Sequence, residues 1–180
     1  MSARPNAGLT LPELLITLAI ASILGSLAAP WWTKMIASNH RIAATNKVVG
    51  LIQYARNEAI KAGQEVVLCP DDGTGACLDG DGLWPYGYTM FINDPPGRPW
   101  RVPGSAGQLA RGTWPANTQI LGNRDGWVFR PLAQRSTNGT FRICDPLDRV
   151  PPRAVIVSAM GRPRTADRLA SGAPIPCPSP

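Results

Sequence analysis

Histidine and metal-binding motifs are scarce in this sequence. It contains one histidine, His40, and its four cysteines include no Cys-x-x-Cys pair. Zinc sites combine Cys and His ligands at short, characteristic spacings, so a zinc site is not expected. No nucleotide-binding motif is present, and a histidine within a predicted helix is more simply a structural residue than a catalytic one. We therefore expect no metal, no cofactor and no enzymatic activity.

Lysine is absent from the second half of the chain, although that half is strongly basic. Residues 98–180 contain twelve Arg, no Lys and four acidic side chains, whereas residues 1–97 contain six basic and eight acidic side chains. The planar, forked cation of arginine fits phosphate and carboxylate groups. A GC-rich genome also favours Arg over Lys, but such a bias does not explain why the charge is confined to one half. The pattern favours recognition of an anionic partner.

Charge of either sign is missing between residues 14 and 30. A helix over residues 9–32 would be about 36 Å long, which is enough to cross the roughly 30 Å hydrocarbon core of a bilayer. We therefore predict a transmembrane helix that ends at Trp31 and Trp32, residues suited to the membrane surface. Glu13 lies within this helix and needs a cationic partner, because an unpaired carboxylate in hydrocarbon is costly.

Residues 1–8 do not have the order of an ordinary secretory signal, because the apolar run follows the small residue Gly8 instead of preceding it. Cleavage after Gly8 would retain the apolar helix and expose a new amine on Leu9. That amine would lie at the depth of Glu13 in a neighbouring copy and could neutralise its carboxylate. A plain signal anchor with a tolerated Glu13 is the alternative.

The short basic leader, Gly8 and the following residues LTLPELL resemble the processing site of type IV pilins and pseudopilins. The resemblance implies that a prepilin peptidase removes residues 1–8, that the amine of Leu9 is methylated, and that Glu13 guides the subunit into a filament. Leu9 stands where the family usually has Phe, and Pro12 replaces an aliphatic residue. Neither departure moves the acid, and a proline in the first helical turn removes no needed donor.

The helical pattern continues after the membrane segment, over residues 33–63, and Gly63 suits its end. Apolar residues at helical spacing form one stripe, and polar residues face away from it, so this half of the helix is amphipathic. The stripe contains Ile36, Ala44, Val48, Leu51, Ile52, Ala55 and Ala59.

Residues 64–180 are expected to form one β-rich globular domain outside the cytoplasm. β-Branched and aromatic runs predict short strands, and Asn138-Gly139 indicates a hairpin turn between residues 134–137 and 140–144. The predicted strands cover residues 65–69, 86–93, 119–121, 126–130 and 153–160. The proline-rich and glycine-rich residues 94–115 are interpreted as a mobile connection. The expected fold class is α+β, with a long N-terminal helix packed on an antiparallel β-sheet.

An even number of cysteines outside the cytoplasm predicts disulfides, and four cysteines allow three pairings. The short separation of Cys69 and Cys77 suggests a local clasp, which leaves Cys144 to hold the proline-rich tail at Cys177. The acidic loop over residues 71–82 lacks the spacing and the closing Glu of a calcium-binding EF-hand, and we interpret it as a solvated turn.

The last predicted strand leads into Gly161-Arg162-Pro163-Arg164. Gly161 permits a sharp exit from the strand, and Pro163 keeps Arg162 extended. Alternate side chains of an extended segment share one face about 6 to 7 Å apart, so Arg162 and Arg164 would form a fixed pair of cations. Such a pair suits the phosphates of a nucleic acid without reading its sequence. A solvated turn with two charged residues is the plainer alternative.

Other arginines are weaker candidates for the same surface. Arg168 follows the motif closely, and Arg153 begins the last predicted strand. Arg98 and Arg101 flank Trp100, and such a group can stack on the bases of single-stranded nucleic acid. The tryptophan can instead anchor this segment on the domain core, which is the interpretation we favour.

The long helix, the strand VVLCP, the Trp-rich middle and a final strand followed by Gly-Arg-x-Arg together resemble minor pilins of the GspH/FimT family, over nearly the whole chain. Members linked to DNA uptake, the FimT type, carry this motif, which Gly161, Arg162 and Arg164 match. The resemblance implies a type IV pilus subunit that binds extracellular DNA and supports natural transformation.

The resemblance also implies a location and partners. The chain would be a single-pass inner-membrane protein with its globular domain in the periplasm, and later part of a pilus outside the cell. Its partners would be other major and minor pilins, the prepilin peptidase, the inner membrane and DNA. A minor pilin or type II secretion pseudopilin that initiates or caps filament assembly without binding DNA is the alternative.

Overall fold

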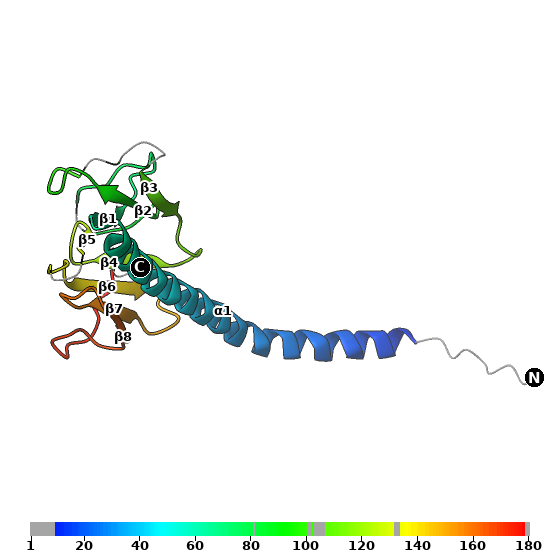
Figure 1. Cartoon of the computed structure of the whole chain (residues 1–180). Helices are drawn as coiled ribbons and strands as arrows, with labels where there is room; N and C mark the ends of the chain where they lie inside the picture. The colour runs from blue at the N-terminus through cyan, green and yellow to red at the C-terminus, as the bar shows by residue number, and fades with distance from the viewer. Residues whose placement is uncertain (1–9, 81, 101, 103–106, 132–133, 179–180) are drawn as a thin grey trace, which may run out of the picture. The chain divides into compact units, whose positions relative to one another are not determined.

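The computed structural model describes residues 10–80, 82–100, 102, 107–131 and 134–178, with the backbone alone for residues 27–30. The chain divides into two compact units, Met1–Ile36 and Ala37–Pro180. Helix α1, Leu11–Ala62, contributes residues to both units (Figure 1).

The first unit contains the N-terminal part of α1, whose large apolar side chains are exposed. Leu15 and Ile23 leave 57% and 61% of their surface accessible, and Trp31 and Trp32 leave 69% and 62%. So many exposed apolar side chains on one helix are unfavourable in water and suit a lipid environment. The helix is long and apolar enough to cross a membrane.

Helix α1 begins at Leu11, so Pro12 lies in its first turn, where no intrahelical N–H bond is needed. Glu13 lies in the same turn, and the backbone N–H of Thr10 donates a long hydrogen bond of 3.5 Å to its Oε2. The expected processing site between Gly8 and Leu9 lies outside the described residues. The cleavage of this bond and the role of Glu13 in assembly stay predictions.

In the second unit, α1 packs through most of the predicted apolar stripe. The buried members of the stripe are Ala44, Val48, Leu51, Ile52, Ala55 and Ala59. Ile36, which was expected to begin the stripe, belongs to the first unit and is 40% exposed. The helix ends at Ala62, and Gly63 follows with a φ of +66°, the conformation of a glycine C-cap.

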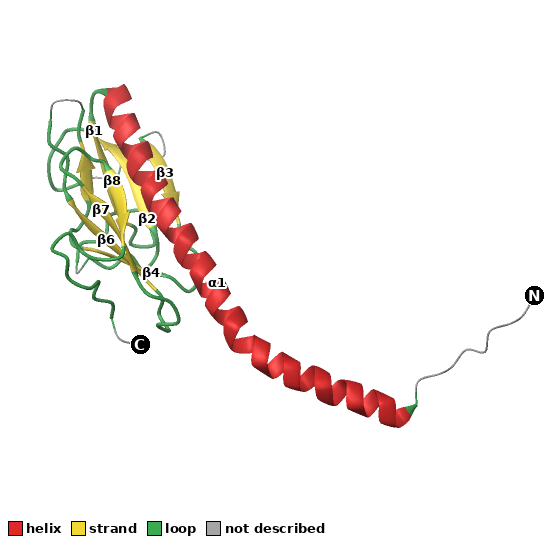
Figure 2. Ribbon diagram, turned by 90° about the horizontal axis from the view of Figure 1, so that it is seen from below, coloured by secondary structure: helices red, strands yellow, loops and turns green. Residues whose placement is uncertain are grey.

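Within the described residues, the strands form two antiparallel sheets of four strands each. Figure 2 shows strands of both sheets beside the second half of α1. The first sheet has the order β3-β2-β1-β5, and its strands are β1 (Glu65–Pro70), β2 (Tyr88–Asn93), β3 (Gln108–Gly112) and β5 (Trp127–Phe129). The second sheet has the order β4-β6-β7-β8, and its strands are β4 (Gln119–Gly122), β6 (Gly139–Cys144), β7 (Arg153–Val157) and β8 (Pro163–Ala166).

One hydrophobic core joins the second half of α1 to both sheets. Trp84, Trp127 and Phe141 are fully buried in it, and the rings of Trp127 and Phe141 stack with centroids 3.8 Å apart. Val155 and Val157 of β7 also enter this core. The second half of the helix and the two sheets therefore form one packed domain, in agreement with the α+β fold expected from the sequence.

The opposite face of the second sheet is covered by the C-terminal tail. Ala154 and Ile156 of β7 form a separate buried cluster with Ile175. A disulfide between Cys144 and Cys177 holds the tail there, with Cα atoms 5.9 Å apart. The two faces of β7 are thus distinct: one packs on the helix, and the other packs on the tail.

Three details of the predicted domain were wrong. Residues 94–115 are not only a connection, because Gln108–Gly112 form the strand β3. Trp100 packs against the buried cluster of Val67, Cys69, Phe91 and Val128, which confirms the favoured interpretation that it anchors its segment on the domain. The strand that begins at Arg153 is not the last one, because Pro163–Ala166 form β8, which includes Pro163 and Arg164 of the motif. Residues 134–137 do not pair with β6 as a hairpin, because the N–H groups of Ser136 and Thr137 donate to the carbonyls of Ala159 and Val128.

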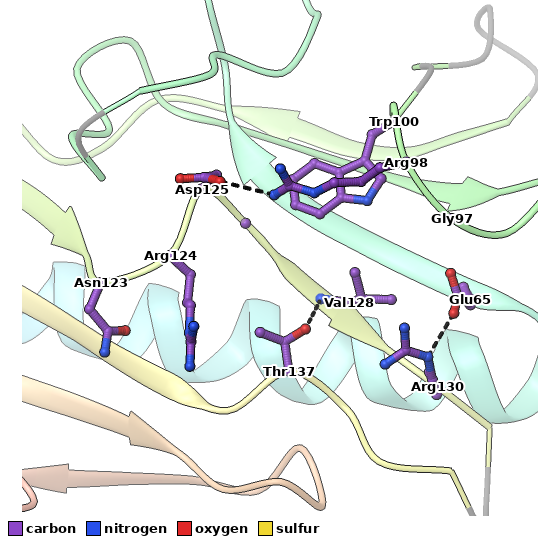
Figure 3. A pocket seen from close by; sticks show the side chains of 11 residues that line it. Glu65, Gly97, Arg98, Trp100, Asn123, Arg124, Asp125, Val128, Arg130 and Thr137 are labelled. Carbon is purple, nitrogen blue, oxygen red and sulfur yellow. Dashed lines mark hydrogen bonds and ion pairs between the residues drawn. The ribbon is translucent and has the colours of Figure 1, made fainter.

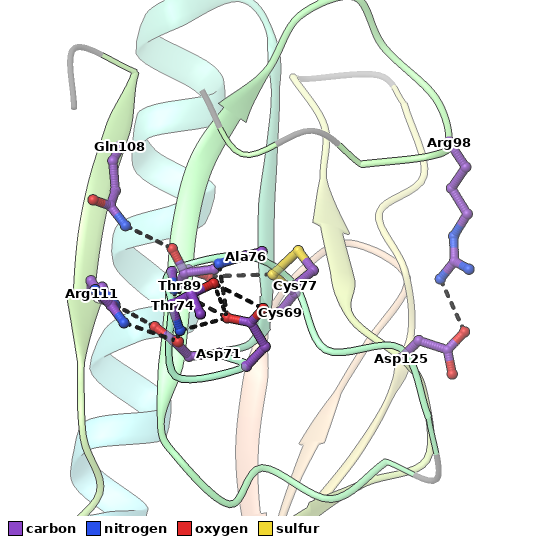
Figure 4. The surroundings of a disulfide bond; sticks show 12 residues. Cys69, Asp71, Thr74, Ala76, Cys77, Thr89, Arg98, Gln108, Arg111 and Asp125 are labelled. Atoms are coloured by element: carbon purple, nitrogen blue, oxygen red, sulfur yellow. Dashed lines mark hydrogen bonds and ion pairs between the residues drawn. A yellow bond between two sulfur atoms is a disulfide. The ribbon is translucent and has the colours of Figure 1, made fainter. Parts of the chain in front are cut away.

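A second disulfide joins Cys69 and Cys77 across the acidic loop, with Cα atoms 5.5 Å apart (Figure 4). The Asp71 carboxylate is buried and forms an ion pair with Arg111. Burial raises the pKa of Asp71, but hydrogen bonds from Arg111 and from the N–H groups of Gly73 and Gly75 outweigh it and hold the pKa below its usual value. The carboxylate thus serves the loop's own structure.

Candidate nucleic-acid interface

The Gly-Arg-Pro-Arg motif forms a tight hairpin between β7 and β8. The N–H of Ser158 donates to the carbonyl of Arg162 at 3.0 Å, and the N–H of Arg162 donates to Oγ of Ser158 at 3.2 Å. The register then pairs Val157 with Pro163 and Ile156 with Arg164. The motif is therefore held by backbone hydrogen bonds on both sides of the turn.

Gly161 is the buried centre of this turn. Its φ is +69°, a conformation that residues with a Cβ atom rarely adopt. A Cβ atom there would lie 3.3 Å from Cδ1 of Phe129, 3.4 Å from Cδ of Arg56 and 3.5 Å from Oγ of Ser136. The turn therefore packs closely against β5, α1 and the segment before β6.

Arg162 and Arg164 are both exposed. Because Arg164 is opposite Ile156, it lies on the face of the second sheet that points away from the main core. Arg162 is two residues earlier and continues the ladder opposite Ser158, so it is placed on the same face. Among the residues that the structure describes, neither guanidinium has a hydrogen bond or an ion pair. The predicted pair of cations is thus exposed and unneutralised.

The weaker candidates are engaged by other groups. Arg153 forms an ion pair with Asp167 at 3.0 Å. The guanidinium of Arg168 donates to the carbonyl of Gly172 at 3.1 Å. Arg101 lies outside the described residues. These contacts occupy part of the hydrogen-bonding capacity of Arg153 and Arg168, so fewer of their N–H groups are left for a bound anion.

Arg98 is held between two neighbours. It forms an ion pair with Asp125 at 3.1 Å, and its guanidinium lies 4.1 Å from the ring centroid of Trp100 (Figure 3). Its charge is therefore partly neutralised and its plane is fixed.

Arg124 is an exposed cation that the sequence did not single out. Its Nε donates to the carbonyl of Asn138 at 3.3 Å, which places Arg124 beside the start of β6. Gly139 pairs with Val157, so Asn138 is next to the turn that carries Arg162. No local pattern marks this residue, because its position depends on three segments that meet only in the folded domain.

A long helix that packs its second half on antiparallel sheets, after an exposed apolar first half, defines a protein of the type IV pilin class. Among solved structures, the chain is similar to crystal structures of the type IV minor pilin FimU of Pseudomonas aeruginosa. One crystal form gives a TM-score of 0.53 and 18% identity, over 76% of this chain and 94% of that chain. A second crystal form gives a TM-score of 0.49 and 18% identity, over 73% and 94%.

The family model described as type II transport protein GspH matches residues 44–161, and the chain belongs to this family. A model of the prokaryotic N-terminal methylation motif matches residues 3–29. A comparison with curated proteins gave no match. Family and fold together support a structural role as a minor pilin or pseudopilin that assembles with other pilins.

Proposed function

We propose that this minor pilin binds extracellular DNA through the face that carries Arg162 and Arg164. The observation that carries the proposal is the exposure of these two guanidinium groups on a turn fixed by the hydrogen bonds of Ser158. A cation that is already positioned loses little freedom when it meets a phosphate, and arginine can bind phosphate through two parallel hydrogen bonds.

The charge of the surrounding sequence supports the same partner. Residues 98–180 carry twelve Arg against four acidic side chains. Ion pairs neutralise some of this charge at Arg153 and Arg98, whereas Arg162 and Arg164 keep theirs. Phosphate contacts position a nucleic acid but do not read its bases, so binding at this turn is independent of sequence and sensitive to salt.

In the proposed function, the prepilin peptidase removes residues 1–8, and the amine of Leu9 is methylated. The apolar helix holds the subunit in the inner membrane with its domain in the periplasm until Glu13 guides it into a pilus. The exposed turn then captures DNA for uptake in natural transformation. The match of the methylation motif to residues 3–29 supports the processing step.

A role in filament assembly without DNA binding is the second candidate function. The family description, type II transport protein, favours it, and it needs only the helix and Glu13. The two functions differ in what the arginines of the turn do.

The deciding experiment measures the affinity of the full chain for labelled DNA in a nonionic detergent, by fluorescence anisotropy at several salt concentrations. The variant Arg162→Gln/Arg164→Gln should lose about tenfold or more in affinity, and its salt slope should fall by about 0.7 to 0.9 for each lost phosphate contact. Arg153→Gln/Asp167→Asn is the matched control, because it removes two charges that already neutralise each other and leaves the net charge unchanged. Equal affinities of the double variant and the wild type would contradict the proposal and favour the assembly role.

A further inference from the structure

A cleft of about 480 Å³ opens beside β5 and the loop that precedes it. Its lining includes Arg98, Trp100, Asn123, Arg124, Arg130 and Thr137. Figure 3 shows these side chains around an open space, with the Arg98 plane lying over the Trp100 ring. The cleft is not part of the Gly-Arg-Pro-Arg motif. Its residues come from β1, from the connection between β2 and β3, from the loop before β5, from β5 and from the segment between β5 and β6.

Residues 136–138 form a wall shared by the cleft and the turn. On one side, the N–H of Ser136 donates to the carbonyl of Ala159 in the turn at 2.9 Å. On the other side, Thr137 lines the cleft and its Oγ1 accepts a hydrogen bond from the N–H of Val128. Because adjacent extended segments lie about 4.8 Å apart, one chain thickness separates the cleft from the turn.

The charges of the cleft nearly cancel inside it and leave one cation at this wall. Arg98 is paired with Asp125, and Arg130 is paired with Glu65 at 2.7 Å. Arg124 has no ion pair among the residues that the structure describes, and its one hydrogen bond uses Nε, which leaves the terminal nitrogens for a ligand. A ligand that fits these charges carries one negative group, which contacts Arg124. The rest of the ligand, which enters the cleft, is uncharged and flat.

The cleft also contains a preformed platform for a flat ring. Asp125 and Trp100 hold the guanidinium plane of Arg98 from two sides. Guanidinium planes and aromatic rings are the surfaces on which proteins stack unpaired bases. The Asn123 side-chain carbonyl accepts from the N–H of Thr140, which fixes the orientation of its amide and leaves the NH₂ group to hydrogen-bond a ring edge.

We infer that this cleft accepts an unstacked base of single-stranded DNA, with Arg124 on the adjoining phosphate and Arg162 and Arg164 on the phosphates that follow. This inference rests on the proposed DNA binding at the turn, and it makes single-stranded DNA the preferred ligand. In a duplex the bases are paired and stacked, so a base reaches the cleft only when it is flipped out of the helix. A duplex therefore uses the arginines of the turn but not the platform.

The test compares two ligands on the full chain in nonionic detergent: a labelled dT12 oligonucleotide and a 12-base-pair duplex, at the same salt concentration. The wild type should bind the single strand about tenfold more tightly. Arg98→Gln should reduce this preference about fivefold and leave duplex affinity unchanged. Arg124→Gln should weaken the single strand about fivefold, while Lys61→Gln, which removes one exposed charge at the end of α1, should change neither affinity.

A dT12 strand with abasic sites separates the base from the phosphates. It keeps every phosphate and should bind as weakly as the duplex. Equal binding of intact and abasic strands, with no effect of Arg98→Gln, would overturn the inference and leave phosphate capture at the turn intact. Unchanged binding of both ligands by Arg162→Gln/Arg164→Gln would instead overturn the proposed function itself.

Photochemical cross-linking gives a second readout that does not depend on affinity. A dT12 strand with 5-iodouracil should cross-link to the tryptic peptide that contains Trp100 or to the one that begins after Arg124. Cross-links confined to the peptides of the β7–β8 hairpin would contradict a base in the cleft. A single-stranded RNA of the same length should cross-link at the same peptides, because a stacking platform does not contact the 2′-hydroxyl.

Discussion

Gly161 lies directly against Phe129: a Cβ atom on this glycine would be 3.3 Å from Cδ1 of the ring. Phe129 is fully buried in the main core, so the ring cannot move away without disturbing the packing around it. The turn that exposes Arg162 and Arg164 is thereby fixed to the centre of the domain. The packing of the core therefore fixes the position of the two arginines together with the motif itself.

The first prediction concerns this contact. Gly161→Ala should destabilise the domain by about 1 to 2 kcal/mol from the left-handed backbone alone, and by more because of the close contact with Phe129. It should also weaken DNA binding, because the turn must shift while both arginines are still present. Thermal unfolding and anisotropy measure the two effects.

The control for this prediction is Gly172→Ala. Gly172 has a φ of +83°, but a Cβ atom on this glycine would have no neighbouring atom within 4 Å. The control should therefore carry a similar backbone cost and keep its affinity for DNA. Loss of affinity in both variants would show that reduced stability, and not the position of the turn, is responsible.

The second prediction concerns the ion pair between Arg153 and Asp167, whose atoms are 3.0 Å apart. Asp167→Asn should increase DNA affinity slightly and steepen its salt dependence by about 0.7 to 0.9, because it releases a cation on the same sheet as the turn. Stability should change by less than about 1 kcal/mol, since the pair is exposed. In an Arg153→Gln background the same change should not steepen the salt dependence, because no cation is released to contact a phosphate, and a steeper slope there would contradict the role of the pair.

Local sequence signals predicted the helix well and the sheet only in part. The stripe from Ala44 to Ala59 repeats at helical spacing, and such periodicity is visible without knowledge of a partner. The sequence predicted an extended segment around Pro163 but not the strand β8, because no run of β-branched or aromatic residues marks it. The structure accommodates Pro163 because β8 is at the edge of its sheet and Pro163 is its first residue, so no ladder hydrogen bond from it is needed.

The candidate site, like the sheet, could be predicted only in part from local sequence signals. Arg162 and Arg164 were found because they are two residues apart in the sequence and follow a predicted strand. Asn138-Gly139 does not form the predicted hairpin turn, because the N–H groups of Ser136 and Thr137 donate to the carbonyls of Ala159 and Val128 and Gly139 already belongs to β6. The position of Arg124 depends on its hydrogen bond to Asn138 of this same segment, so no local pattern could have placed Arg124 beside the turn.

The third prediction concerns the two disulfides. Cys144 and Cys177 are separated by 33 residues, and Cys69 and Cys77 by 8 residues. The chain-entropy model then gives about 3.7 kcal/mol for the first bond and about 2.5 kcal/mol for the second. Cys144→Ser/Cys177→Ser should therefore lower the unfolding temperature more than Cys69→Ser/Cys77→Ser. The opposite order would show that the buried position of Cys69 matters more than the length of the closed loop.

The fourth prediction concerns pH and the pair formed by Asp145 and Arg149. The Asp145 carboxylate is 2% exposed and accepts hydrogen bonds from the Arg149 guanidinium at 2.6 and 2.9 Å and from its backbone N–H at 2.7 Å. The hydrogen bonds from Arg149, opposed by burial, hold the pKa of Asp145 below its usual value. The unfolded chain thus takes up this proton at a higher pH than the folded domain does.

The sign of the pH effect follows from that difference. The stabilisation by Asp145 is fully present above its unfolded pKa of about 3.9 and is lost as the pH falls through the lower folded value. Asp145→Asn should therefore be less stable than the wild type by about 1 to 3 kcal/mol at pH 7. The difference should shrink steadily below pH 4. Thermal unfolding of both proteins between pH 7 and pH 2.5 measures it, and a constant difference over that range would mean that Asp145 contributes by packing and not by its charge.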